Sequence, residues 1–182
     1  VDVGVIVHNV GTTYAVYEAV QKNKPLIERV VTVTGDSVKI PSNFLVRIGT
    51  PLMDLLLAAG GIPEDTGKIV SGGPMMGKAI ADLDVPVAKG TSGIVLIRKS
   101  ESMRAEVYNC VHCGKCIEAC PMGLEPYRLL LLTKKGDSEK AFEEHVMDCI
   151  ECGSCSFVCP SNRPIVDYIR LGKTIVRSKP KS

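Results

Sequence analysis

All eight cysteines of this 182-residue chain lie between residues 110 and 159, in two copies of one pattern. In each copy three cysteines are separated by two residues, and a fourth follows after three more residues, directly before a proline. The offset between the copies is constant, so that each cysteine of the first copy has a counterpart in the second. Any fold of this chain therefore has to form two related cysteine loops. The cysteines are Cys110, Cys113, Cys116 and Cys120 in the first copy, and Cys149, Cys152, Cys155 and Cys159 in the second.

Three other uses of cysteine fit this pattern poorly. A secreted domain held by disulfides would not leave the whole chain before Cys110 without a cysteine. A structural zinc site takes two C-x2-C pairs, so the third and fourth cysteines of each copy would be superfluous. Buried, inert thiols have no reason to recur at a fixed spacing. The pattern is that of bacterial ferredoxins, in which three cysteines of one run bind one [4Fe–4S] cluster and the fourth binds the other cluster.

We therefore predict two [4Fe–4S] clusters whose cysteine ligands cross between the copies. The crossing would hold the two clusters close together, as a relay of single electrons requires. Gly114 and Gly153, which follow the second cysteine of each copy, would let backbone amides approach the inorganic sulfides. We name the two expected ligand sets quartet 1, which is Cys110, Cys113, Cys116 and Cys159, and quartet 2, which is Cys149, Cys152, Cys155 and Cys120.

Composition excludes several classes of protein. The chain is 45% hydrophobic and 23% charged, which is typical of neither a disordered chain nor a coiled coil. A formal charge of +2 gives no reason to expect a nucleic-acid partner. No stretch approaches 18 consecutive apolar residues, so the sequence predicts no membrane span. The chain opens inside an apolar run without an initiator Met, from which we expect a piece of a longer protein.

The sequence predicts an α+β fold, with a β-grasp-like domain over residues 29–100 and a mostly helical dicluster ferredoxin domain over residues 101–182. In the first domain Thr50 would cap a helix over residues 52–59. In the second, Pro126 opens one helix, and Asp137 or Ser138 would cap the next. The strands expected in the first domain are 29–35, 37–48, 68–77 and 90–99, and the helices expected in the second are 124–133, one from 138 onward, and one from 164 toward 177.

Residues 1–28 are expected to be the remnant of an α/β domain that binds a flavin or nucleotide. A buried strand over residues 3–7 would lead through a polar, glycine-containing turn into a helix over residues 13–22. Such turns bind phosphates on the free amides of the helix N-terminus. Two readings of the turn stay open, because Asn9 and Thr12 can also serve only to form it and cap the helix. The residues that would touch a cofactor are His8, Asn9, Gly11 and Thr12.

The segments HNVGTTYAVYEAV, KPLIERVVTVTG and SGGPMMG, followed by the doubled cysteine pattern, resemble the C subunit of the Rnf (Rsx) electron-transport complex, which is related to the flavin-bearing NADH subunit of respiratory complex I. The resemblance covers essentially the whole chain. It implies a subunit of an enzyme that couples electron transfer between ferredoxin and NAD to ion translocation. The expected location is peripheral, on the cytoplasmic face of the bacterial inner membrane. The implied partners are the other subunits, including ferredoxin-like and membrane-embedded ones, so that contact with the membrane is indirect.

The resemblance also implies FMN and NAD(H) in the full-length protein, with the turn at Asn9 contacting the flavin. Because residues 1–28 contain no glycine-rich nucleotide loop, we expect that this chain alone does not hold FMN or NADH tightly. No side chain is expected to act as an acid, base or nucleophile, and electrons would pass through the cysteine-bound clusters. Two other hypotheses remain open, namely a dicluster subunit of a soluble oxidoreductase and a zinc-stabilised interaction module.

The metal content of the chain separates these hypotheses. After strictly anaerobic purification we expect about eight irons and about eight acid-labile sulfides per chain, because each predicted cluster contributes four of each. Elemental analysis and a sulfide assay measure both. Stoichiometric zinc without sulfide would contradict the prediction.

Overall fold

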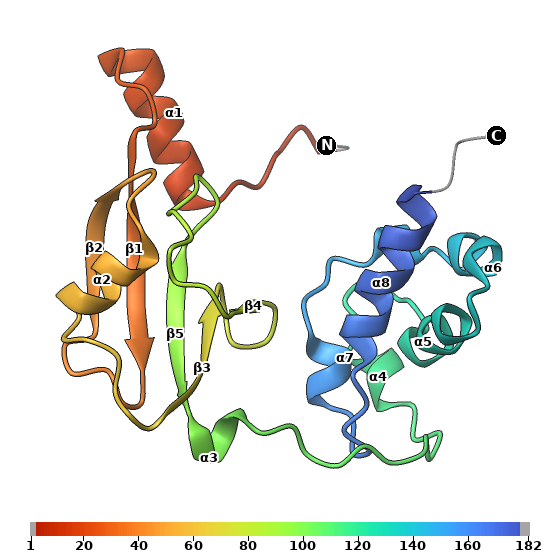
Figure 1. Cartoon of the computed structure of the whole chain (residues 1–182). Coiled ribbons are helices and arrows are strands. Elements are labelled where there is room, and N and C mark those ends of the chain that lie inside the picture. Colours follow the sequence, from red (N-terminus) through yellow and green to blue (C-terminus); the bar gives the residue numbers. More distant parts are fainter. Residues whose placement is uncertain (1–2, 179–182) are drawn as a thin grey trace. The chain divides into compact units, whose positions relative to one another are not determined.

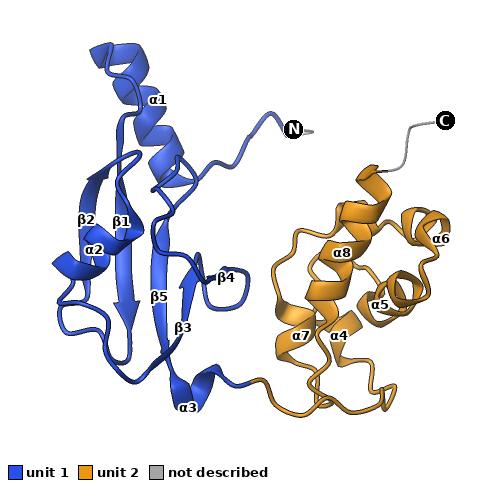
Figure 2. Ribbon diagram, viewed as in Figure 1, with its two compact units in different colours: residues 1–103 blue, residues 104–182 orange. Residues whose placement is uncertain are grey.

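The computed structural model describes residues 3–178 and divides into two compact units, residues 1–103 and 104–182 (Figure 2). The second unit begins at Arg104, close to residue 101, where the sequence predicts the start of the helical domain. All eight cysteines lie in the second unit. The two units are described separately below.

Unit 1 contains a five-stranded sheet with the strand order β2-β1-β5-β3-β4 (Figure 1). The central strands β1 and β5 are parallel, and each forms an antiparallel pair with the strand on its other side. Strand β5 thus lies between the hairpins β1–β2 and β3–β4. This mixed sheet fits the predicted β-grasp-like domain, and the expected α+β class is confirmed. The strands are β1 (Glu28–Gly35), β2 (Ser42–Arg47), β3 (Thr66–Ser71), β4 (Lys78–Ile80) and β5 (Gly93–Arg98).

The core of unit 1 lies between this sheet and helix α2 (Leu52–Ala58). In β1 the buried Val31 and Val33 alternate with exposed threonines, as expected for a strand with one covered face. Leu52, Leu55 and Leu56 of α2 are buried in the same cluster, because residues three and four apart share one face of a helix.

The capping and the third strand of unit 1 differ from the prediction. Thr50 does not cap α2, because the helix starts after Pro51 and no side chain caps it. The carbonyl of Thr50 instead accepts a hydrogen bond from the amide of Val87 at 2.8 Å. The run predicted over residues 68–77 ends as a strand at Ser71, and the following turn, closed by a hydrogen bond between Gly77 and Gly73, returns the chain as β4.

The N-terminal segment also corrects the sequence analysis. Helix α1 (Val10–Lys22) is present, but it begins at Val10 instead of the predicted residue 13. The strand expected over residues 3–7 is wrong, since these residues are exposed and form no strand. An apolar run becomes a strand only where a neighbour supplies hydrogen bonds, and no described strand pairs with this segment.

Unit 2 is helical (Figure 1). Its two longest helices, α5 (Pro126–Lys135) and α8 (Ile165–Ser178), pack against each other and contribute to its core. Pro126 occupies the first turn of α5, and the side chain of Asp137 accepts a hydrogen bond from the amide of Lys140 at the start of α6, as predicted. The short helices of unit 2 are α4 (Lys115–Glu118), α6 (Ser138–Glu143), the 3-10 helix η1 (Val146–Asp148) and α7 (Ser154–Phe157). The short helix α3 (Lys99–Ser102) precedes them, at the end of unit 1.

The repeat extends from the cysteines to the helices. Helices α4 and α7 begin at equivalent positions of the two copies, and so do α5 and α8. Two further equivalent positions, Thr133 on α5 and Gly172 on α8, touch each other where these helices meet. A methyl group on Gly172 would overlap the hydroxyl oxygen of Thr133. Gly172 therefore sets how closely the two halves of unit 2 approach.

We expect Gly172→Ala to destabilise the chain by about 1–3 kcal/mol through overpacking. At a helix position without this contact the same change would stabilise by up to about 1 kcal/mol. Chemical denaturation monitored by circular dichroism measures the free energy of unfolding. The double variant Gly172→Ala/Thr133→Ala should recover most of the loss, because alanine removes the hydroxyl that the new methyl meets. A single variant as stable as the parent chain would contradict this account of the helix contact.

Candidate metal centre

Each cysteine loop owes its shape to two residues with left-handed backbone conformation. The residue just before the second cysteine is His112 in the first copy (φ 52°) and Glu151 in the second (φ 57°). The glycine after the second cysteine, Gly114 or Gly153, has φ 78° or 83°. These turns wrap the loop tightly before α4 or α7 begins, and glycine adopts this conformation without the cost of a side chain. Both copies thus repeat in backbone geometry as well as in sequence.

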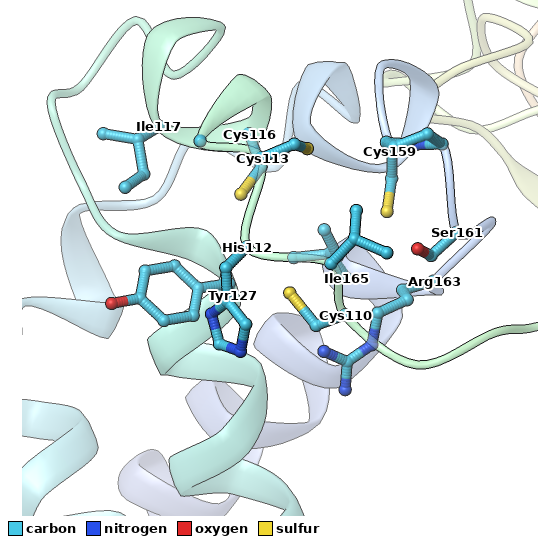
Figure 3. Close-up of a pocket in the computed structure, with 13 residues that line it drawn as sticks. Cys110, His112, Cys113, Cys116, Ile117, Tyr127, Cys159, Ser161, Arg163 and Ile165 are labelled. Carbon is cyan, nitrogen blue, oxygen red and sulfur yellow. The ribbon is translucent and has the colours of Figure 1, made fainter.

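The four thiols of quartet 1 line one cavity of about 170 Å³ in unit 2. Figure 3 shows their sulfur atoms around a common space, with Cys159 reaching it from the second copy. His112, Tyr127 and Arg163 also line this cavity. Cys113 is exposed, so quartet 1 has one edge at the surface of the chain.

The four thiols of quartet 2 line a second, smaller cavity of about 20 Å³. Cys120 reaches it from the first copy, as Cys159 reaches the other. The rest of the lining is apolar, and Leu124, Val166 and Ile169 contribute to it. The structure therefore brings together the same crossed sets of cysteines that the sequence predicts as ligands.

The arrangement of the thiols suits an inorganic cluster. A zinc ion requires its sulfur ligands about 2.3 Å from a single point. In a [4Fe–4S] cluster each thiolate binds a different iron, so the four sulfurs surround a larger volume. The four thiols of each quartet line one cavity, so the residues present supply the four protein ligands that this group requires.

Burial makes several of these thiols hard to deprotonate. Burial raises the pKa of Cys155 to about 11, and it also raises the pKa of Cys116 and Cys149. The neighbouring thiols that add to these three shifts belong in each case to the same quartet. The pKa of Cys152 is instead lowered, chiefly by its hydrogen bond with Ser154 Oγ at 3.4 Å. Cysteine binds metal as the thiolate, and burying several negative thiolates together costs free energy. The positive charge of bound iron would compensate for this cost.

The sequence analysis missed an ion network beside quartet 2. The Nζ atom of Lys173 on α8 donates hydrogen bonds to the carbonyl of Cys149 and to the carboxylate of Glu151, both at 2.8 Å. The available signal was the apolar pattern of α8, in which Ile165, Ile169 and Lys173 fall on one face of the helix at intervals of four. A lysine on the buried face of an amphipathic helix needs a polar partner.

The predicted flavin-contacting residues lie at the start of α1 in unit 1. All four are exposed, and the side chain of Asn9 accepts a hydrogen bond from the amide of Gly11 at 2.9 Å, so that it caps the helix. Asn9, Gly11 and Thr12 line a cavity of about 610 Å³, whose described lining does not include His8. Helix capping is thus observed for Asn9, and flavin contact stays a prediction. Among the described residues no helix is both long and apolar enough to span a membrane.

Comparisons with known proteins agree with both units. Residues 30–79 match the SLBB domain, and residues 109–163 match the 4Fe-4S dicluster domain. The second match includes all eight cysteines, which supports the two predicted [4Fe–4S] clusters.

Similar proteins extend over nearly the whole chain. It is 49% identical, over 95% of its length, to the C subunit of the proton-translocating ferredoxin:NAD(+) oxidoreductase complex of Clostridium ljungdahlii. It is 45% identical over 94% to the C subunit of the ion-translocating oxidoreductase complex of Rhodobacter capsulatus, and 42% identical over 94% to the C subunit of the Na(+)-translocating ferredoxin:NAD(+) oxidoreductase complex of Acetobacterium woodii. The chain spans 38%, 33% and 39% of these relatives, respectively. The resemblance drawn from the sequence is confirmed.

Double substitutions test which cysteines share a cluster. If the ligands cross, Cys113→Ala/Cys159→Ala alters only quartet 1 and should leave about four irons per chain. Cys152→Ala/Cys159→Ala alters both quartets, although both residues lie in the second copy, and should remove or damage both clusters. Iron and sulfide analysis after anaerobic purification measures the difference. The reverse order of iron contents would show that each copy binds its own cluster.

Proposed function

We propose that this chain relays single electrons through two [4Fe–4S] clusters. The premise is that the chain belongs to the family of C subunits of the ion-translocating oxidoreductase complexes. It spans about a third of the length of these relatives. The observation that carries the proposal is the pair of crossed cysteine quartets, each lining its own cavity in unit 2. The proposed ligands are Cys110, Cys113, Cys116 and Cys159 for the first cluster, and Cys120, Cys149, Cys152 and Cys155 for the second.

The residues of this chain would bind the clusters, hold them near each other and shield them from water. A bound [4Fe–4S] cluster accepts and releases one electron at a time. Because each loop contributes its fourth cysteine to the other quartet, the two cavities are fixed within one small helical body. The apolar side chains around quartet 2, Leu124 and Val166 among them, keep water from the buried thiolates.

The names of the relatives support a place for the relay in a larger enzyme. Two of them are named as subunits of ferredoxin:NAD(+) oxidoreductase complexes that translocate protons or Na⁺. We infer that the clusters connect the FMN and NAD(H) site of the full-length protein with ferredoxin-like subunits of such a complex. FMN suits that position because it exchanges two electrons with nicotinamide and single electrons with clusters. The proposed location is the cytoplasmic face of the bacterial inner membrane, with the membrane-embedded subunits as neighbours.

The turn before α1 is the part of this chain that we propose to contact FMN in the full-length protein. Asn9, Gly11 and Thr12 line the large cavity beside α1, which supports their role, while His8 has only its neighbouring position in the turn. The amide of Gly11 already has a partner in Asn9, so a flavin phosphate would have to compete for it. This competition accords with our expectation that the chain alone binds FMN weakly.

The relay is tested by breaking one cluster in the complete complex. Cys152→Ala should reduce electron flow from NADH to the downstream acceptor to background, because one site of the relay is lost. Gly90→Ala is the control and should leave the electron flow unchanged. A methyl group at Gly90 meets no other atom, and Gly90 lies outside the segment that carries the cysteines. Flow that is unchanged in Cys152→Ala would refute the proposal.

A further inference from the structure

Lys173 is a buried charge in contact with the second cysteine loop. Its side chain is 8% exposed, and its Nζ atom donates to the Cys149 carbonyl and to Glu151 Oε1, both at 2.8 Å. Burying an ammonium group is costly unless it is paired and hydrogen-bonded. Both partners belong to the segment that carries the first two thiols of quartet 2. Lys173 thus joins α8 to the backbone of the cysteine loop.

Arg170 lies one turn earlier on α8 and strengthens the same connection. Its Nε atom is 3.1 Å from the second carboxylate oxygen of Glu151. Glu151 therefore meets one cation at each oxygen, and these contacts hold a residue whose left-handed conformation shapes the loop. Two cations thus face one carboxylate beside quartet 2.

The first copy has no equivalent network among the described residues. The residue that corresponds to Glu151 is His112, and the one that corresponds to Lys173 is Lys134, which is exposed. His112 instead packs edge-on against Tyr127, with ring centroids 6.2 Å apart. The repeat therefore provides two quartets with similar backbones and different charges around them.

The surroundings of quartet 2 contain few polar groups that could screen the charge of Lys173 from a cluster bound there. The cavity of quartet 2 is lined by apolar residues apart from its thiols. The Lys173 ammonium group is itself buried and lies 2.8 Å from the carbonyl oxygen of Cys149, whose thiol belongs to quartet 2. Charges interact more strongly in such surroundings than in water.

We propose that Lys173 is a positioning residue for the second cluster and that its charge raises the reduction potential of that cluster. One-electron reduction adds one negative charge to a cluster, and apolar surroundings disfavour the added charge. A fixed cation nearby favours the reduced form, so it counteracts this effect. The proposal rests on the proposed function, because it requires a [4Fe–4S] cluster in quartet 2.

The test is a redox titration of the full chain, purified anaerobically, with dithionite as electron donor and electron paramagnetic resonance as readout. Lys173→Gln removes a positive charge and should lower the midpoint potential of the second cluster. We expect on the order of a tenfold change in the ratio of reduced to oxidised cluster at a fixed potential, about 59 mV for one electron. Cys113→Ala, which removes a ligand of the first cluster, identifies which midpoint belongs to the second.

Three further variants separate charge from structure. Glu151→Gln removes a negative charge and should raise the same midpoint, whereas general loosening of the loop would shift both variants in one direction. Lys173→Arg keeps the charge and should retain a midpoint near that of the parent chain. Lys134→Gln, the exposed equivalent in the repeat, should leave both midpoints unchanged.

Each outcome decides between the two proposals. Two clusters with unchanged midpoints in Lys173→Gln, or shifts of the same sign in Lys173→Gln and Glu151→Gln, would overturn the role of Lys173 and leave the relay intact. If Lys173→Gln cannot hold the second cluster, the sign of the shift in Glu151→Gln decides. A parent chain that binds no cluster would instead overturn the proposed function.

Discussion

Unit 2 is organised around the exchange of one cysteine between two otherwise similar loops. Cys120 leaves the first loop to join quartet 2, and Cys159 leaves the second to join quartet 1. Neither loop can complete its quartet without the other, so both have to be held at a fixed separation. The contact between α5 and α8, with Gly172 against Thr133 and a shared apolar core, provides that separation. The helical frame of the unit is thus the support that crossed ligation requires.

The repeat is symmetric in backbone and asymmetric in surroundings. Quartet 1 has an exposed cysteine and the polar neighbours His112, Tyr127 and Arg163. Quartet 2 is lined by apolar side chains and is approached by the buried Lys173. Net charge, hydrogen bonds and solvent exposure set the potential of an iron–sulfur cluster. Two copies of one motif can in this way bind two clusters with different reduction potentials, because the side chains around the motif differ.

Prediction from the sequence succeeded where the residue type itself restricts the local backbone or the ligand geometry. The cysteine spacing predicted which four thiols line each cavity, and Pro126 predicted the start of α5. Asp137, one of the two predicted candidates, caps α6. Prediction failed where the outcome depends on distant partners. None of the described strands pairs with the apolar run at residues 3–7. The Thr50 carbonyl accepts a hydrogen bond from the amide of Val87, which lies far along the chain. Propensity cannot reveal whether such a partner exists.

The sequence by itself determined which thiols gather at each cavity and the order of the two domains, because cysteine spacing and hydrophobic periodicity are local properties. The tertiary structure alone decided what surrounds each quartet. Lys173 lies well beyond Cys149 in the sequence, and it reaches the loop only because α8 packs against α5 and turns that side chain inward. Contacts between helices set such placements, so the charge beside quartet 2 is a property of the folded chain.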